Sequence, residues 1–361
     1  MSRQTPLHQV HEALGARMID FAGWDMPVWY NSATDEHHAV RCGAGLFDLS
    51  HMAELFVTGP DAGAALDWAL LIEASTMPVG RARYSMMCNE MGGIIDDLIV
   101  YRLDEHEFMV VANASNGPTV FAELVERSSR FDAQLEDQTD GFALLAVQGP
   151  KAEEIVLRLT GPELGELRYY RVAHVEVLGT TAYAARTGYT GEDGFELFVP
   201  AELGPALWDA LMAAGSDDGL VPVGLAARDT LRLEAGMPLY GNELSLETTP
   251  FDVGSARLVK PKDGGCVGGD ALAAAAEEPH DFLVGLHIDG RRPARTGYEV
   301  RSDGWVVGVV TSGAPSPTLG QNIAIARLDH TPTIGGTVEV DIRGTETSAT
   351  VVELPFYRRP H

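Results

Sequence analysis

Short strand-like segments separated by single helical patterns dominate the first three quarters of the chain. Alternating or continuous apolar residues predict strands over 54–58, 97–103, 108–112, 143–148, 174–178 and 195–199. Apolar residues at helical spacing predict helices over 61–72, 118–128, 150–159, 205–214 and 225–235. Because strands and helices do not alternate strictly, the pattern predicts an α+β fold with antiparallel strand pairing.

The pattern changes near residue 280. Five strand candidates follow, separated by Gly, Pro and Ser turns and without a convincing helix: 282–288, 305–311, 323–327, 337–342 and 349–354. Five short strands within about 80 residues predict a small antiparallel barrel or sandwich. We therefore expect two regions, residues 1–279 and a C-terminal β domain over residues 280–361, for which we predict the barrel.

Charge narrows the classes of partner. The 361 residues include 52 Asp and Glu against 26 Lys and Arg, which gives a formal net charge of −26. An apolar content of 45% excludes a disordered chain in spite of that charge. A chain this acidic is repelled by phosphate backbones and by anionic lipid, so we expect neither nucleic acid nor a membrane surface as a partner.

The cysteine spacing and the lengths of the apolar runs bear on the cellular location of the protein. The three cysteines, Cys42, Cys88 and Cys266, are widely spaced and form no Cys-x-x-Cys or Cys/His cluster. Neither a disulfide framework nor a structural zinc site is therefore expected. No apolar run in the sequence reaches the roughly 18 residues of a membrane span, and the N-terminus has no signal-peptide pattern. We expect a cytoplasmic protein.

Two adjacent carboxylates interrupt an apolar segment that follows the turn-forming pair Gly92-Gly93. If this segment is a strand, Asp96 and Asp97 point to opposite faces, so at least one of them points into a core or a cleft. A partly buried carboxylate has a raised pKa unless it is paired, which suits proton transfer or ligand binding. The residues alone do not choose between Asp96 and Asp97. The alternative is that one caps a turn while the other faces solvent.

A glycine-rich segment, Arg-Thr-Gly-Tyr-Thr-Gly-Glu-Asp-Gly-Phe-Glu, ends at Glu196. Its spacing matches neither nucleotide-binding glycine pattern, and its acidic residues would repel phosphate. We interpret it as a tight loop entering a strand, with Glu196 directed inward to accept hydrogen bonds from an aminopyrimidine-type edge or to pair with an arginine. Arg228 is the candidate partner, because it shares a helical face with Leu225 and Leu231. A purely structural ion pair is the alternative.

These motifs, in this order, make the chain similar to one family: the folate-dependent aminomethyltransferase, or T-protein, of the glycine cleavage system. The similarity is nearly full-length and includes Phe-Asp-Leu-Ser-His-Met, Gly-Gly-Ile-Ile-Asp-Asp-Leu, Val-Gln-Gly-Pro, the glycine-rich segment, Ala-Arg-Asp-Thr-Leu-Arg-Leu-Glu and Pro-Phe-Tyr-Arg. The resemblance implies a three-domain cloverleaf around a central folate site, with two interleaved α+β domains before the barrel. It implies no metal.

The resemblance also implies a reaction and a partner. The aminomethyl group on the lipoyl arm of the H-protein would pass to tetrahydrofolate, a co-substrate, giving 5,10-methylenetetrahydrofolate and ammonia. By the same resemblance, Asp97 is the catalytic carboxylate, Glu196 binds the pterin edge and Arg228 contacts folate. Further folate contacts are implied for residues of the matching motifs: Met52, Tyr84, Asn113 and Tyr189.

Two other functions remain to be compared with this one. A tetrahydrofolate-dependent demethylase of a free small methylated substrate would keep the fold and the pterin site but change the donor. A non-catalytic folate-binding factor of iron–sulfur cluster assembly would carry Lys-Gly-Cys-Tyr-x-Gly-Gln-Glu, which the sequence lacks. We therefore predict aminomethyl transfer.

Overall fold

The computed structural model describes residues 2–331 and 333–360, and it confirms the α+β class. The chain divides into two compact units. The first consists of Met1–Ser85 and Leu98–Arg228, and the second of Met86–Asp97 and Asp229–His361. Among the described residues, no helix is both long and apolar enough to cross a lipid bilayer.

The five helices predicted from the sequence are all present. They are α3 (Ala62–Ala69), α4 (Gly117–Ser128), α5 (Ala152–Thr160), α6 (Gly204–Ala214) and α7 (Leu225–Glu234). Pro118 occupies the first turn of α4, where its missing N–H costs no hydrogen bond. The structure adds α1 (His8–Ala13), α2 (Ala33–Cys42) and α8 (Gly269–Ala275). Helix α2 begins where the hydroxyl of Ser32 accepts a hydrogen bond from the Asp35 N–H.

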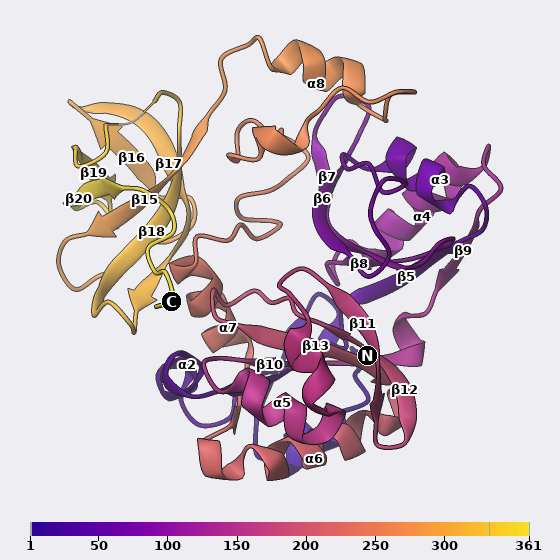
Figure 1. Ribbon diagram of the computed structural model, residues 1–361. Helices are drawn as coiled ribbons and strands as arrows, with labels where there is room; N and C mark the ends of the chain where they lie inside the picture. Colours follow the sequence, from indigo (N-terminus) through magenta and orange to yellow (C-terminus); the bar gives the residue numbers. More distant parts are fainter. Residues whose placement is uncertain (1, 332, 361) are drawn as a thin grey trace. The chain divides into compact units, whose positions relative to one another are not determined.

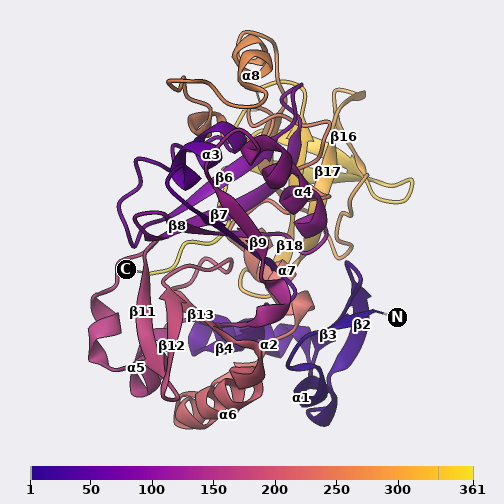
Figure 2. The same ribbon diagram turned by 90° about the vertical axis from the view of Figure 1, so that its right-hand side faces the viewer.

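The first unit contains a six-stranded sheet in the order β11-β12-β13-β10-β4-β14. These strands are Val172–Val177, Thr180–Ala185, Gly194–Pro200, Phe142–Gln148, Gly45–Asp48 and Val221–Pro222. A three-stranded sheet near the N-terminus has the order β1-β3-β2, from Arg3–Gln4, Trp24–Trp29 and Arg17–Phe21 (Figure 2).

A five-stranded sheet has the order β6-β7-β8-β5-β9. Its strands are Ala82–Cys88, Ile94–Asp104, Glu107–Ala112, Ala53–Thr58 and Gln134–Asp137. Strands β6 and β7 continue into the second unit, whereas β8, β5 and β9 belong wholly to the first. The strands predicted over 54–58, 97–103 and 108–112 are confirmed here.

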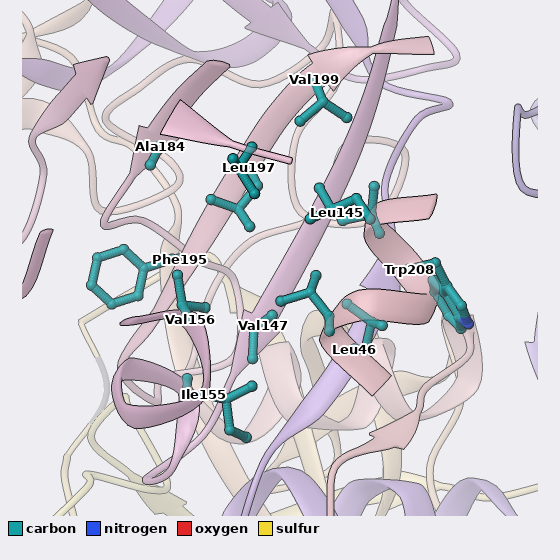
Figure 3. Packing of buried hydrophobic residues seen from close by; sticks show 14 of the residues in the cluster. Leu46, Leu145, Val147, Ile155, Val156, Ala184, Phe195, Leu197, Val199 and Trp208 are labelled. Carbon is teal, nitrogen blue, oxygen red and sulfur yellow. The ribbon is translucent and has the colours of Figure 1, made fainter. Parts of the chain in front are cut away.

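The main apolar core of the first unit lies between the six-stranded sheet and helices α5 and α6. Figure 3 shows Leu145 of β10 and Leu197 of β13 within this cluster, together with Ile155 and Val156 of α5 and Trp208 of α6. Residues 152, 155 and 156 follow helical spacing, so α5 turns one apolar stripe toward the sheet. The opposite face of the sheet does not contribute to this core.

A buried polar network connects the N-terminal segment to strand β4. The His11 ring lies 2.9 Å from the Asp48 carboxylate and, through its other nitrogen, 2.9 Å from the Tyr30 hydroxyl. The same carboxylate accepts hydrogen bonds from the Thr5 hydroxyl at 2.7 Å and from the Ser50 N–H at 2.9 Å. Because the buried Asp48 carboxylate is hydrogen-bonded by several groups, these contacts hold the N-terminal segment against β4.

The second unit ends in a closed antiparallel barrel in the order β15-β18-β17-β16-β19-β20, which confirms the predicted barrel (Figure 1). Its strands are Phe282–Ile288, Gln321–Leu328, Trp305–Ser316, Glu299–Ser302, Thr337–Asp341 and Glu346–Val352. The prediction missed β16, because this four-residue strand has Val300 as its single large apolar side chain and a bulge interrupts its pairing with β17.

Helix α7 is bonded to the barrel within this unit. The buried Arg232 guanidinium bonds the Glu243 carboxylate at 2.9 Å and the Ser312 hydroxyl at 2.8 Å. At the end of the helix, the Glu234 carboxylate accepts hydrogen bonds from the hydroxyls of Ser316 at 2.5 Å and Thr318 at 2.7 Å. Breaking one partner of such a buried pair leaves an uncompensated charge, so these contacts fix α7 on the barrel.

The polar network at Asp48 predicts an acid-sensitive contribution to stability. Burial by itself raises the pKa of Asp48, but hydrogen bonds from His11, Ser50 and Thr5 outweigh it and hold the pKa below the ordinary value of 3.8. A lowered pKa stabilises the folded state above that ordinary value, and the stabilisation is lost as the pH falls through the folded-state pKa. Asp48→Asn should lower the free energy of unfolding by about 2 kcal/mol at pH 7.

Urea unfolding at several pH values, followed by tryptophan fluorescence, tests this expectation. The difference between the native chain and Asp48→Asn should shrink below about pH 4. The exposed Asp217→Asn is the control and should behave like the native chain throughout. A difference that stays constant down to pH 3 would contradict the assignment.

Candidate functional site

The face of the six-stranded sheet that is turned away from the core carries the candidate site. Along β10, Ala143, Leu145 and Val147 enter the core, so strand alternation turns Ala146 and Gln148 to the other face. Glu196 is the residue of β13 paired with Ala146. Its carboxyl group therefore lies on this second face. That placement agrees with the inward orientation expected from its apolar neighbours.

Glu196 is buried and meets hydroxyl donors. The Tyr101 hydroxyl donates to its carboxylate at 3.2 Å, and the Thr187 hydroxyl donates to the same oxygen. Burial raises the pKa of Glu196 above the ordinary value, although both hydrogen bonds and the charge of Arg228 act in the opposite direction. Glu196 is thus a buried hydrogen-bond acceptor whose proton is easier to retain than that of an exposed glutamate.

Arg228, in the first turns of α7, lies over the ring of Tyr189. The guanidinium carbon is 4.7 Å from the ring centroid, which is a cation–π contact. The charge of Arg228 acts electrostatically on Glu196, as the motif spacing suggested. The same charge, after burial, lowers the pKa of His51 to about 4. The His51 imidazole is therefore uncharged at neutral pH.

Glu196 and Arg228 line one small hollow with seven other residues. The lining residues are Phe47, Leu49, Ala146, Gln148, Gly188, Tyr189, Thr190, Glu196 and Arg228. Apolar and aromatic side chains form most of the surface, and its polar groups are one carboxyl, one guanidinium, one amide and the hydroxyls of Tyr189 and Thr190. The volume of the hollow is about 10 Å³, room for about one water molecule, so it can receive a polar atom or the edge of a ring and not a whole ring.

The loop that carries Tyr189 is held from two sides. The Gln148 side chain donates to the Thr187 carbonyl at 3.0 Å and accepts from the Thr190 hydroxyl at 2.9 Å. From α2, the buried Arg41 guanidinium donates to the Thr190 carbonyl and to the Glu192 carboxylate, both at 2.8 Å. Because these partners are buried and mutually satisfied, the loop has one defined conformation.

Two glycines make this arrangement possible. A Cβ atom at Gly188 would lie 2.0 Å from the side-chain oxygen of Gln148, and one at Gly194 would lie 2.4 Å from its nitrogen. Arg186, at the start of the loop, donates to Asp193 at its end and to Glu153 of α5 at 2.6 Å. The glycines of the motif therefore serve close packing against Gln148 and not the binding of phosphate.

Asp96 and Asp97 lie on β7, in the Met86–Asp97 segment of the second unit. Asp96 is fully buried and Asp97 is partly exposed, as expected for neighbours on opposite faces of a strand. The segment is held within this unit, since the Ile94 N–H donates to the carbonyls of Ser245 and Thr248. A Cβ at Gly93 would lie 2.1 Å from the Leu246 carbonyl oxygen, which explains the second glycine of the turn.

The other residues expected from the motifs are distributed over the first unit. Tyr189 lines the hollow, whereas Met52, Tyr84 and Asn113 are not among its described lining residues. Met52 follows β4, Tyr84 lies on β6, and the Asn113 carbonyl accepts N–H bonds at the start of α4.

Three residues at the hollow were missed by the sequence reasoning. Tyr101 and Thr187 bond Glu196, and Gln148 holds the loop. Gln148 and Thr187 lie inside recognised motifs, each directly before a glycine, and Tyr101 lies within the strand predicted over 97–103. Such residues can be found in a sequence where a polar side chain takes an inward position of a strand at which alternation predicts an apolar one.

The side chains of the hollow can accept N–H donors at Glu196 and attract an anionic group near Arg228. Among residues 2–331 and 333–360, no group of three or more His, Cys, Asp and Glu side chains is placed to hold a metal ion. The polar side chains that line the hollow supply hydrogen-bonding groups and charge.

Comparison with known proteins places these residues in a family. Residues 7–263 match the GCVT N-terminal domain, and residues 282–358 match the glycine cleavage T-protein C-terminal barrel domain. The sequence is 57% identical over 361 residues to an aminomethyltransferase of Saccharopolyspora erythraea, covering 99% of this chain and 98% of the relative. An aminomethyltransferase of Streptomyces coelicolor is also 57% identical, over 364 residues and with the same coverage.

A solved structure agrees with the sequence comparison. The aminomethyltransferase T of the glycine cleavage system from Bartonella henselae superposes with a TM-score of 0.92 at 37% sequence identity. The match covers 100% of this chain and 99% of that one.

The contact between Gly188 and Gln148 predicts that a single methyl group disturbs the hollow. Gly188→Ala should lower the free energy of unfolding by about 1–3 kcal/mol, because the new Cβ overlaps the Gln148 side chain. Gly141→Ala is the matched control, since a Cβ there lies 3.9 Å from its nearest neighbour, Gln138, and should change stability by less than about 0.5 kcal/mol. Urea unfolding of both variants measures the change in the free energy of unfolding. Equal changes in the two variants would contradict the close contact between Gly188 and Gln148.

Proposed function

Because the chain belongs to the glycine cleavage T-protein family of aminomethyltransferases, we propose that its acceptor is tetrahydrofolate and that its donor is the aminomethylated lipoyl arm of the H-protein. The products would be 5,10-methylenetetrahydrofolate, ammonia and the dihydrolipoyl carrier. Tetrahydrofolate is then a co-substrate and the lipoylated H-protein the protein partner, and we expect the reaction to occur in the cytosol.

The atoms of this reaction balance without a redox step. The methylene carbon exchanges its bonds to the lipoyl sulfur and to the amino nitrogen for bonds to N5 and N10 of the folate. The two protons lost from those nitrogens are recovered on the sulfur and on the departing ammonia. A carboxylate that orients an N–H and moves one proton meets this requirement, and we assign that role to Asp97.

Glu196 carries the argument for a folate. A pterin presents adjacent N–H donors on one ring edge, and Glu196 is a buried carboxyl group aligned by Tyr101 and Thr187 inside a mainly apolar hollow. Burial makes a hydrogen-bonded carboxylate selective, because a ring without the donors would leave the charge unsatisfied.

Arg228 supplies the positive charge that an anionic folate needs in a protein of net charge −26. Its contact with Tyr189 presents a cation beside an aromatic ring in the same hollow. We propose further folate contacts from Met52, Tyr84 and Asn113, which belong to the same unit as Glu196.

An assay with two donors separates this function from the demethylase alternative. Aminomethylated H-protein and tetrahydrofolate are supplied, and methylenetetrahydrofolate and ammonia are measured. Turnover with the carrier supports the proposal. Turnover only with a free methylated donor would replace it by the demethylase.

Asp97→Asn should lower kcat by about 10²- to 10⁴-fold, because the amide cannot accept and release the proton. The dissociation constant for tetrahydrofolate should change by less than about threefold, since the amide keeps the size and a hydrogen-bonding oxygen. Single-turnover assays and calorimetry measure the two quantities. Asp104→Asn, exposed at the end of the same strand, is the control and should keep full turnover. Near-normal turnover of Asp97→Asn would reject the catalytic assignment.

Glu196 predicts a pH-dependent affinity. Its pKa is raised, so part of the population is protonated in mild acid and cannot accept two N–H bonds. Affinity for tetrahydrofolate should therefore rise with pH through the raised pKa. Glu196→Gln should bind about 10- to 100-fold more weakly at pH 7 and lose this component of the pH profile. Equal profiles for both proteins would contradict the role of Glu196.

A further inference from the structure

Helix α2 turns a charged face toward the interior of the first unit. Its buried residues recur at helical spacing along one face: Glu36, His37, Val40 and Arg41. Glutamate and arginine are rarely buried unless they are paired. Arg41 is paired with Glu192, whereas Glu36 has a different set of partners.

The Glu36 carboxylate joins two segments of backbone that are far apart in the chain. One oxygen accepts hydrogen bonds from the N–H groups of Tyr30 at 2.7 Å and Asn31 at 3.2 Å, directly after β3. The other oxygen accepts from the N–H of Gly224 at 2.9 Å, directly before α7. One buried carboxylate therefore holds the end of β3, the first turn of α2 and the start of α7 together.

The Gly224 peptide passes this restraint on to Arg228. Its carbonyl accepts a hydrogen bond from the Arg228 N–H at 3.1 Å, so Glu36 is two hydrogen bonds away from the backbone of Arg228. A Cβ atom at Gly224 would lie 2.5 Å from the Val28 carbonyl oxygen. The chain thus approaches β3 as closely as only a glycine allows, which fixes where α7 begins.

Helix α2 holds both members of the cation–π contact in the candidate site. In its first turn, Glu36 holds the peptide that leads to Arg228, and in its last turn Arg41 donates to the Thr190 carbonyl, in the loop that carries Tyr189. The Arg228 guanidinium lies 4.7 Å from the Tyr189 ring centroid, and both residues line the hollow. The described lining residues include none from α2, so the helix acts on the hollow from behind.

We propose that Glu36 is a positioning residue for the ligand site: it sets where the Arg228 guanidinium lies against Tyr189, and thereby the affinity for an anionic co-substrate. Glu36 itself is 4% exposed and does not touch the ligand. The effect on affinity rests on the proposed binding of tetrahydrofolate, whereas the effect on the position of Arg228 does not.

A carboxylate is required because all of its partners here are N–H donors. An amide in its place has one oxygen and one NH2 group, so one side of it meets a donor with a donor. Tyr30 and Asn31 together favour the oxygen, which leaves the NH2 group facing the Gly224 N–H. Glu36→Gln should therefore displace the start of α7 without creating a cavity.

Fluorine NMR of the chain labelled with 3-fluorotyrosine measures the position of Arg228 without any ligand. The chain has ten tyrosines, and Tyr189→Phe identifies the signal of Tyr189. Arg228→Met shows where this signal lies when the cation is absent. In Glu36→Gln the Tyr189 signal should move toward that position, because the guanidinium is displaced from the ring. Asp35→Asn removes a charge at the exposed neighbouring position and should leave the signal unchanged.

A double-mutant cycle tests whether Glu36 acts through Arg228. In calorimetric titrations with tetrahydrofolate, Glu36→Gln should weaken binding about 3- to 10-fold and Arg228→Met about 10- to 100-fold. In the Arg228→Met background, Glu36→Gln should weaken binding by less than about twofold further, since the group that it positions is gone. Asp35→Asn should keep the native affinity.

Two results would overturn the proposal. The first is a Tyr189 signal that stays at its native position in Glu36→Gln, which would leave Glu36 with a role in stability alone. The second is a loss of affinity on Glu36→Gln that is as large in the Arg228→Met background as in the native chain. If the native chain does not bind tetrahydrofolate, the proposed function is rejected instead, and the fluorine signal decides the positioning role.

Circular dichroism establishes that each variant is folded before it is measured. If Glu36→Gln does not fold, Glu36→Asp takes its place. This variant keeps the negative charge, but its carboxylate is one methylene too short to meet both Tyr30 and Gly224. The expected changes in the Tyr189 signal and in affinity have the same direction.

Discussion

Antiparallel pairing of β10 with β13 is the constraint on which the candidate site depends. The pairing sets Ala146 opposite Glu196, and the two-residue period of each strand then assigns every neighbour to one face or the other. Leu145 and Leu197 enter the core, while Glu196 and Gln148 are directed to the opposite side. A register shift of one residue would bury the carboxyl group among the aliphatic side chains and expose the core. The packing of α5 and α6 on the core face therefore also fixes the site.

Charge in this protein is balanced locally at buried positions. Asp48 is satisfied by His11 and by two further donors, and Arg41 is paired with Glu192 where both side chains are buried. Glu196 instead meets two hydroxyl donors. Hydroxyls leave it less stabilised than an ion pair would, which is consistent with its raised pKa and leaves it able to take up further donors from a ligand. The net charge of −26 therefore says little about the site itself.

The sequence by itself determined the α+β class, the C-terminal barrel and most of the helices, because apolar periodicity and the Pro and Gly signals are local. It also determined that Glu196 is directed inward, since its neighbours on β13 are apolar. Strand β16 was missed, because a short segment with one large apolar residue becomes a strand only through pairing with β17 and β19. Tertiary structure alone decided that Tyr101 and Thr187 bond Glu196. Such contacts join residues far apart in the chain, and periodicity within one segment carries no information about which distant segment will lie against it.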